Sequence, residues 1–169
     1  MLHTGNISAV SETRHAYAGG IVGEGSTDTA SNLYNTGNIS VKSLGSSGYR
    51  GCAGGIFGEH SSGPLNPYNL VNSYNVGEVS NLGNESYLGG LIGQVSHAPD
   101  LSICYFSDSV ASVAIGWARM GGSLNDSVQA LSDSQMRQQA SYVGFDFTNT
   151  WAISLTVNNG YPYLQGTQP

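Results

Sequence analysis

Charged side chains are scarce in this chain of 169 residues, and cationic ones are the scarcest. It has 5 Lys and Arg residues against 11 Asp and Glu residues, which gives a formal net charge of −6. Lys42 is the single lysine, and the arginines lie far apart in the sequence. Binding to nucleic acid or to an anionic membrane needs clustered cations that neutralise phosphates. We therefore expect no nucleic-acid partner.

Long apolar runs and cysteines are also scarce. A membrane-spanning helix needs about 20 consecutive apolar residues. No stretch approaches that length, so we expect no membrane insertion. Cys52 and Cys104 are the two cysteines, and neither lies in a CxxC pattern. They are either buried free thiols that act as small apolar residues or a single disulfide of an extracellular protein.

Glycine and small polar residues dominate what is present. The chain has 24 Gly and 10 Tyr, and 39% of its residues are hydrophobic. Glycine and small polar residues favour tight turns. The apolar fraction is large enough to offset the loss of chain entropy on folding. We therefore expect a folded chain with many short strands and turns.

Two motifs recur along the chain. The first, Asn35–Ser40, returns as Asn75–Ser80, and its tail appears earlier as Thr4–Ser8. The second follows each time and has the form Gly-Gly-aliphatic-apolar-Gly at a spacing of 35 residues. Its three copies begin one residue before the Gly pair and are Ala18–Gly23, Ala53–Gly58 and Leu88–Gly93.

Each copy has the pattern of β-strands that cannot bury their apolar face alone. Ile39 and Val41 alternate with polar residues, which is the period of a strand. Glycines in the second motif allow either positive φ or a close approach of neighbouring backbone. Stacking equivalent copies buries a continuous core and brings like residues side by side. The expected ladders are Tyr34/Tyr74/Tyr105, Ile7/Ile39/Val79/Val110, Asn35/Asn75 and Ile21/Ile56/Leu91.

These patterns predict a mainly β fold, a short β-solenoid with a C-terminal capping segment that contains a short helix. A β-propeller is the alternative, although its blades need four strands per repeat. Residues 1–115 would form about three and a half copies of about 35 residues. A fourth copy starts at Tyr105, has Asp108 in place of a glycine, and retains at best a remnant of the second motif at Met120–Ser123.

Residues 116–169 would form a cap packed on the last copy, because an open end would invite edge-to-edge aggregation. Ser132 and Gln135 form a capping-box pattern that predicts a short helix from Asp133 to about Ala140. The largest apolar group of this segment, Trp151, should be buried against the last copies, near Tyr105 or Val110.

The two motifs resemble the GLUG-motif repeat family of bacterial secreted and surface proteins. Asn72–Ser80 followed by Gly89–Gly93 carries the resemblance, and the tail from Leu131 to Leu164 is similar to the segment that closes such arrays. The resemblance implies the C-terminal end of a repeat array in a larger, extracellular or cell-surface, adhesin-like protein. It implies an accessory role without catalytic residues, preceded by further repeats of the parent chain.

We therefore expect a non-catalytic structural or adhesive segment. A carbohydrate-binding module and an accessory domain of a secreted hydrolase are the alternatives. Against an enzyme, no two of the four histidines have i,i+4 spacing and no Gly-x-Ser-x-Gly motif is evident. The Gly-Gly-x-x-Gly segments lack a following Lys-Ser or Lys-Thr, so we expect no phosphate-binding loop and no cofactor.

One column of the repeat is acidic. Glu24, Glu59 and Gln94 each follow the last glycine of the second motif. Stacking would place the two carboxylates on neighbouring strands about 5 Å apart, where like charges repel. Either they turn outward into water, or a hard cation such as Ca²⁺ bridges them.

Tyrosines raise the alternative of sugar binding. Tyr34, Tyr74 and Tyr105 fall on one repeat column, which a buried ladder explains without any ligand. Tyr49 and Tyr68 fall in longer loops and are the better candidates for ligand contact. The partner would be a host or matrix protein, or a glycan.

Overall fold

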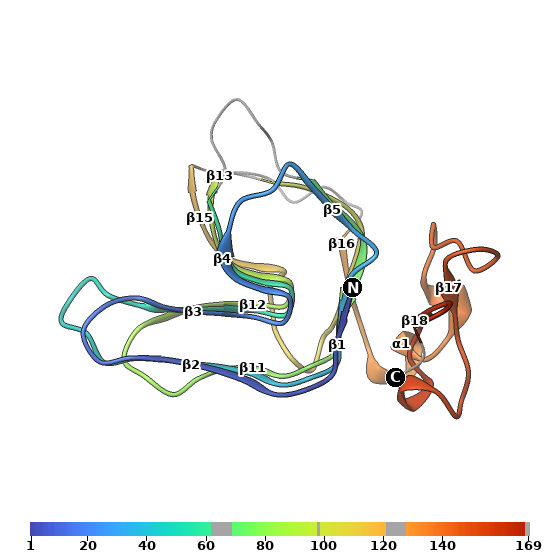
Figure 1. Cartoon of the computed structure of the whole chain (residues 1–169), viewed down its shortest axis with the longest axis horizontal. Helices are drawn as coiled ribbons and strands as arrows, with labels where there is room; N and C mark the ends of the chain where they lie inside the picture. The colour runs from blue at the N-terminus through green and yellow to red at the C-terminus, as the bar shows by residue number, and fades with distance from the viewer. Residues whose placement is uncertain (62–68, 98, 121–127, 168–169) are drawn as a thin grey trace.

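In the computed structural model the chain winds repeatedly through the same four directions, and strands of successive windings lie side by side (Figure 1). The structure describes residues 1–61, 69–97, 99–120 and 128–167. Strands dominate these residues and the one α-helix among them is short, so the prediction of a mainly β fold with a short helix is confirmed.

Four parallel sheets, named A to D here, build the body of the molecule. Sheet A contains β1 (Leu2–His3), β5 (Thr29–Ser31), β6 (Tyr34–Asn35), β10 (Asn69–Asn75), β14 (Asp100–Ser107) and β16 (Val128–Leu131). Sheet B contains β2 (Ile7–Ser11), β7 (Ile39–Ser43) and β11 (Val79–Asn81). Sheet C contains β3 (Ala16–Gly19), β8 (Gly51–Gly54) and β12 (Ser86–Gly89). Sheet D contains β4 (Val22–Gly25), β9 (Phe57–His60), β13 (Ile92–His97) and β15 (Ile115–Met120).

Pairing follows the repeat register that the motifs predict. Tyr34 lies opposite Leu2 and Tyr74, and Tyr74 lies opposite Tyr105. The expected ladders Ile7/Ile39/Val79 and Asn35/Asn75 are likewise confirmed. Backbone hydrogen bonds link the residues of the expected ladder Ile21/Ile56/Leu91. Ile21 N donates to Ile56 O, and Ile56 N donates to Leu91 O.

The fourth copy differs from the prediction. Val110 does not join the ladder of Ile39 and Val79, because it lies in a turn. The N–H of Val110 donates to the carbonyl oxygen of Ser107 at 3.1 Å. The second motif continues at Ile115, which pairs with Ile92 in β15, and not at the expected remnant, whose residues 121–123 lie outside the described ranges. Parallel pairing therefore extends past residue 115, through β15 and β16.

Glycines of the second motif allow the backbones of neighbouring sheets to approach closely. None of them has a positive φ. A Cβ on Gly58, Gly93 or Gly116 would lie 2.6 Å from a backbone nitrogen of sheet C. These nitrogens belong to Ala18, Ala53 and Leu88 respectively. At these positions the backbones of sheets C and D therefore meet directly, with no room for a side chain.

Asparagines form an inner ladder in sheet A. Asn35 and Asn75 are fully buried. Asn35 Nδ2 donates to Asn75 Oδ1 at 2.7 Å and to Gly37 O at 2.7 Å. Each asparagine also accepts from the N–H of the glycine two residues later, Gly37 or Gly77. The ladder thus satisfies buried polar groups within and between windings.

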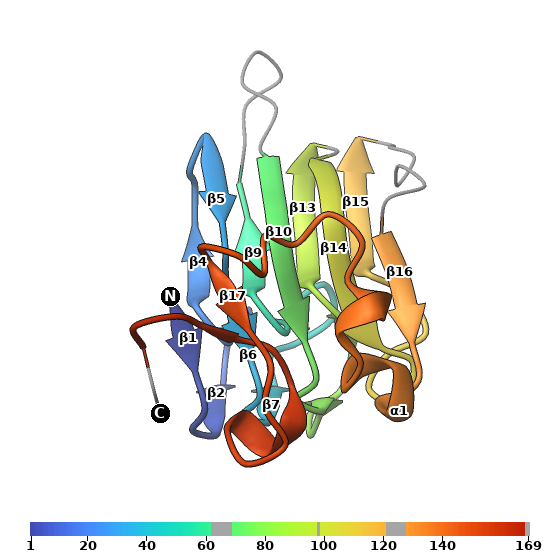
Figure 2. The same ribbon diagram turned by 90° about the vertical axis from the view of Figure 1, so that its right-hand side faces the viewer.

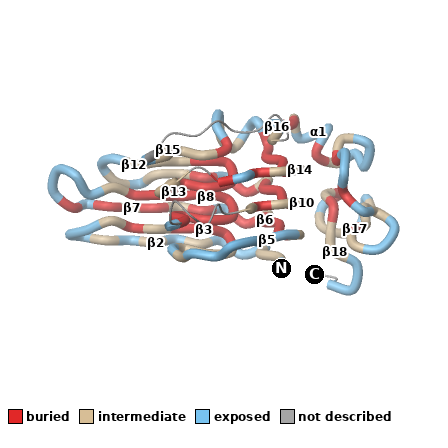
Figure 3. Tube along the Cα trace, turned by 90° about the horizontal axis from the view of Figure 1, so that it is seen from above, coloured by how far each residue is buried: buried red, intermediate tan, exposed pale blue. Residues whose placement is uncertain are grey.

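Buried residues occur along the strands of all four sheets (Figure 3), and among the described residues they form three hydrophobic clusters. The largest lies inside the winding between sheets A and D and includes Ile56, Leu70, Leu91 and Leu101. A second, between sheets B and C, is built from small and β-branched residues such as Ala18, Ile39, Ala53 and Val79.

The third cluster joins sheet A to the closing segment, which is defined here as residues 132–167. This segment contains α1 (Asp133–Met136), 3₁₀ turns at Gln139–Ser141 and Asn158–Gly160, and an antiparallel pair, β17 (Trp151–Ala152) with β18 (Tyr163–Leu164). The capping box of Ser132 and Gln135 is present as predicted, but the helix ends at Met136, before the expected Ala140.

The closing segment lies along the outer side of sheet A instead of covering the end of the stack (Figures 1 and 2). Trp151 is fully buried, as predicted. Its ring packs on Phe145 at 4.6 Å and against Tyr34 and Tyr74 at 5.8 and 5.9 Å, in the same cluster as Tyr105, whereas the predicted alternative Val110 is not part of that cluster. The tyrosine ladder thus provides the surface on which the segment packs.

Gly77 and Gly5 occupy the same repeat column and offer a matched test of the stacking. A Cβ on Gly77 would overlap the carbonyl oxygen of Gly37 in the preceding winding, whereas a Cβ on Gly5 would meet only the His3 side chain at 3.6 Å. We predict that Gly77→Ala lowers the free energy of unfolding by about 1–3 kcal/mol, as overpacking does. Gly5→Ala should be close to neutral. Urea unfolding of both variants measures the difference, and equal effects would contradict backbone contact at this column.

Truncating Trp151 tests the packing of the closing segment. We predict that Trp151→Ala costs about 3–5 kcal/mol, the usual loss for a buried large aromatic residue. Leu155 is 89% exposed in the same segment, so Leu155→Ala is the control and should melt like the parent chain. Thermal melting followed by circular dichroism compares them. A Trp151→Ala variant that melts like the control would show that the segment contributes little to stability.

Candidate functional site

The acidic column lies where sheet D faces sheet C. Glu24 and Glu59 pair in register on β4 and β9, so the two residues lie on neighbouring strands as the repeat predicts. Glu24 is exposed, whereas Glu59 is only 8% exposed. The two carboxylates therefore have different environments, although their repeat positions are equivalent.

Glu59 is held by its neighbour of the next winding. Gln94 Nε2 donates to Glu59 Oε1 at 3.2 Å, and Gln94 Oε1 accepts from the Cys52 thiol at 3.3 Å. Glu59 Oε2 is buried and has no hydrogen-bond partner among the described residues. An uncompensated buried carboxylate oxygen is costly. It marks this position as one where a polar group could bind.

The structure gives limited support for a cation here. Ca²⁺ takes 6–8 oxygen ligands. Within the described ranges, no group of three or more His, Cys, Asp or Glu side chains is placed to hold a metal ion. The bridging cation at Glu24 and Glu59 stays a prediction.

Each strand of sheet C contacts the sheet D strand of its own winding and the sheet D strand of the next winding. Strand β3 contacts β4 and β9, β8 contacts β9 and β13, and β12 contacts β13 and β15. The side-chain pairs join strands that are offset by one winding: Cys52 with Gln94, and Tyr87 with Trp117. Tyr17 likewise interacts with Glu59. We call these six residues the C–D corner.

Burial shapes the ionisation of the corner. Burial is the main cause that raises the pKa of Tyr17 well above its ordinary value, and the nearby Glu59 carboxylate acts in the same direction. Burial and the nearby Glu59 carboxylate raise the pKa of Cys52 to about 12, although Arg50 acts in the opposite direction. Both groups are therefore neutral at physiological pH and act as hydrogen-bonding groups, and Cys52 is not an activated nucleophile.

Aromatic rings dominate the far end of the corner. Tyr87 and Trp117 stack with ring centroids 5.2 Å apart and planes 10° apart. The Arg50 guanidinium lies over the Tyr87 ring at 5.2 Å and forms an ion pair with Glu85 at 3.0 Å. Cation–π and ion-pair contacts both restrict the arginine. Tyr87 and Trp117 are each partly exposed.

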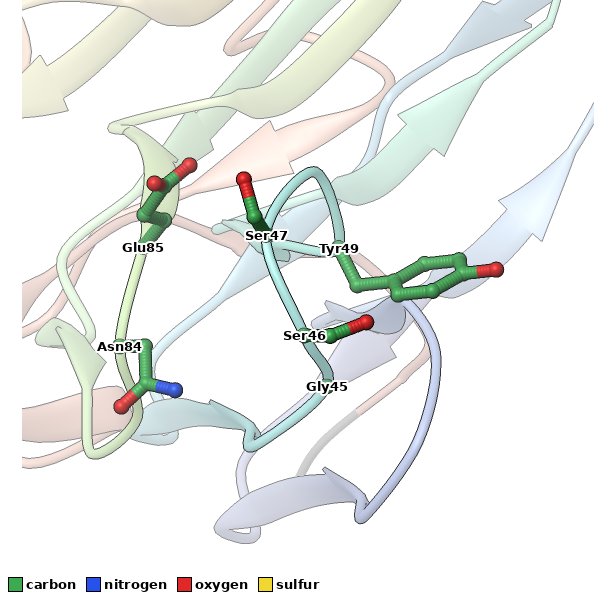
Figure 4. A pocket seen from close by; sticks show the side chains of 6 residues that line it. All are labelled: Gly45, Ser46, Ser47, Tyr49, Asn84 and Glu85. Carbon is green, nitrogen blue, oxygen red and sulfur yellow. The ribbon is translucent and has the colours of Figure 1, made fainter.

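Tyr49, predicted to contact a ligand, lies in a loop beside this surface. It is 37% exposed, and its ring packs edge-on against His15 at 5.2 Å. It lines a cavity of about 100 Å³ together with Gly45, Ser46, Ser47, Asn84 and Glu85 (Figure 4). In that view the Tyr49 ring points away from Glu85. Ligand sites usually measure about 300–1,000 Å³, so this cavity is too small for one. Tyr68 lies outside the described residues.

Sequence reasoning missed most of the corner. Tyr17, Cys52 and Tyr87 are spaced by 35 residues, so their column could have been recognised from the repeat. The repeat position of Trp117 could not be recognised from the sequence, because the glycine pair of the second motif is absent from the fourth copy. Cys52 and Cys104 are both buried free thiols, so the disulfide alternative is wrong.

No helix among the described residues is long and apolar enough to span a membrane. Comparison of the chain with family models, curated proteins and solved structures finds no match.

The two thiols give a test of this burial. Burial raises the pKa of Cys104 to about 12, as for Cys52. We predict that neither thiol reacts with Ellman's reagent within minutes at pH 8 in the folded protein, and that both react in guanidinium chloride. A fast-reacting native thiol, assigned with Cys52→Ser and Cys104→Ser, would contradict the burial.

The same shifts predict alkaline instability. The folded-state pKa of each thiol lies above its ordinary value of 9.0. The associated stabilisation is therefore present below about pH 9 and is lost as the pH rises toward 12. Urea unfolding between pH 8 and 10.5 should show a falling free energy of unfolding, and the fall should be smaller in Cys104→Ala. An unchanged pH dependence in that variant would contradict the assignment.

Proposed function

We propose that this chain is a short β-solenoid that serves as a non-catalytic structural or adhesive segment of a larger, secreted or cell-surface bacterial protein. The observation that carries the proposal is the parallel, in-register pairing of equivalent repeat residues in all four sheets. Such pairing supports a solenoid over a propeller, because each copy bonds chiefly to the copies before and after it.

The lateral position of the closing segment supports a role in a longer array. It packs on the side of sheet A and spans the tyrosines of three windings. The backbones of β2, β3 and β4 form the outer edge of their sheets among the described strands. Further repeats of a parent chain could pair with these edges without rearrangement. The bacterial and extracellular parts of the proposal rest on the resemblance to GLUG-motif repeats and on the low charge of the chain.

Changing the number of repeats tests this function. In a solenoid, stability is approximately a sum of repeat and interface contributions, so a whole extra repeat is tolerated. We predict that a chain with residues 38–77 duplicated after Gly77 folds cooperatively and melts at or above the temperature of the parent. An enzyme whose site depends on one fixed arrangement would not tolerate such a change.

The matched control inserts residues 38–57 at the same point, which joins non-equivalent columns and should disrupt folding. Circular dichroism gives the strand content, and small-angle scattering should show an increase in length of about 5 Å, the spacing of one strand. If the full-repeat and half-repeat insertions behave alike, the solenoid proposal is wrong.

A further inference from the structure

The first winding, residues 2–33, leaves core positions partly exposed that the second winding buries. Ile7 and Ile21 pack against the hydrophobic clusters but are only partly buried. Their counterparts in the second winding, Ile39 and Ile56, are fully buried. Figure 2 shows the first winding, in blue, at one end of the stack, and β2, β3 and β4 are edge strands among the described strands. Apolar side chains and strand edges are therefore presented together at this end.

Glu24 lacks the facing residue that its counterparts in later windings have. In the C–D corner, a sheet C residue faces the sheet D residue of the next winding. Tyr17 interacts in this way with Glu59, and the thiol of Cys52 donates to Gln94. Glu24 is the equivalent sheet D residue of the first winding, and no described winding precedes it. It is exposed, whereas Glu59 is 8% exposed, so one half of a facing pair is missing.

Two columns of sheet B and its approach are incomplete in the same way. Asn38 N donates to Asn6 Oδ1 at 3.1 Å, and Glu78 N donates to Asn38 Oδ1 at 3.2 Å. Each winding thus offers a side-chain carbonyl to an N–H of the next, and by this relation the N–H of Asn6 would take one from a preceding winding. A Cβ on Gly37 would overlap the carbonyl of Gly5, whereas a Cβ on Gly5 would meet no backbone of another winding.

We propose that the first winding is a docking surface for a further winding of the same repeat, and that this winding presents a neutral hydrogen-bond donor to Glu24. A tyrosine in its sheet C strand would face Glu24 as Tyr17 faces Glu59. An acidic residue would not fit, because like charges at facing positions repel. The proposal names the chemistry of the repeat that pairs with this end, and therefore rests on the proposed function.

The opposite end of the stack argues against a second copy of this chain as the occupant. Among the described strands, sheets B and C end at β11 and β12, whereas sheets A and D continue past that winding to β16 and β15. This end is therefore stepped. It would meet the first winding of another copy in sheets A and D alone.

Adding a winding to the chain tests the proposal. A second copy of residues 2–33 is inserted between Met1 and Leu2, so that residue 33 of the copy joins Leu2 as residue 33 joins Tyr34, the ladder partner of Leu2, in the parent chain. We expect Gly5→Ala to be close to neutral in the parent chain. In the extended chain it should lower the midpoint of urea unfolding about as much as Gly77→Ala does in the parent, because its Cβ would then overlap a carbonyl of the added winding.

A double-mutant cycle in the extended chain tests the facing pair itself. It combines Glu24→Ala in the original winding with Tyr17→Phe in the added copy. We expect the two changes to depart from additivity by at least about threefold in the unfolding equilibrium constant, as residues in contact do. Tyr17→Glu in the added copy should lower the urea midpoint further, and Glu24→Ala should recover part of that loss. Glu12→Ala removes an exposed carboxylate of the same winding outside the C–D corner and is the control, which should be additive with Tyr17→Phe.

The proposal is wrong if Gly5→Ala stays neutral in the extended chain, if the Glu24 and Tyr17 changes are additive, or if the added winding unfolds separately from the rest. Light scattering gives a further outcome. Self-association of the parent chain that the added winding abolishes would show that a second copy occupies this end instead. Each of these failures leaves the proposed function standing if the chain with residues 38–77 duplicated folds cooperatively, so the two proposals can be separated.

Discussion

Close backbone contact between equivalent residues is the constraint on which the rest of this structure depends. Gly37 and Gly77 stack on the same column of the preceding winding, where a single Cβ would overlap a carbonyl group. Gly58 and Gly93 allow sheet D to lie against sheet C. Because both contacts are made by backbone, the windings cannot slip in register without leaving buried donors and acceptors unpaired.

Most of the ladder pairing was predictable from the sequence, and the reason is physical. Repeated residues such as Tyr34 and Tyr74 share an environment, so their spacing reports the pairing directly. The prediction fails where the repeat degenerates. Val110 has the right spacing but lies in a turn, and Ile115 continues a ladder although the glycine pair before it is missing. Backbone pairing tolerates these changes, whereas a sequence pattern does not reveal them.

Contacts between different sheets were harder to predict. The burial of Trp151 follows from its size, but its position follows from the outward-facing tyrosine ladder, which a repeat pattern does not locate in space. The pairing of Glu24 with Glu59 was predictable because both lie in one column. The contact of Tyr87 with Trp117 was not, because it joins two columns and two windings. The close approach of sheets C and D, which glycines such as Gly58 and Gly93 allow, brings such residues together.

The side-chain pairs between sheets C and D suggest how the surface at the C–D corner could vary among repeat arrays of this kind. Each facing pair in the corner takes one residue from one winding and its neighbour from the next, as Cys52 and Gln94 do. The smallest unit of this surface is therefore the junction between two repeats. Reordering or duplicating intact repeats would create new facing pairs without altering any codon within them. Recombination between repeats could thus produce new surfaces while leaving the glycine and asparagine columns, and hence the fold, untouched.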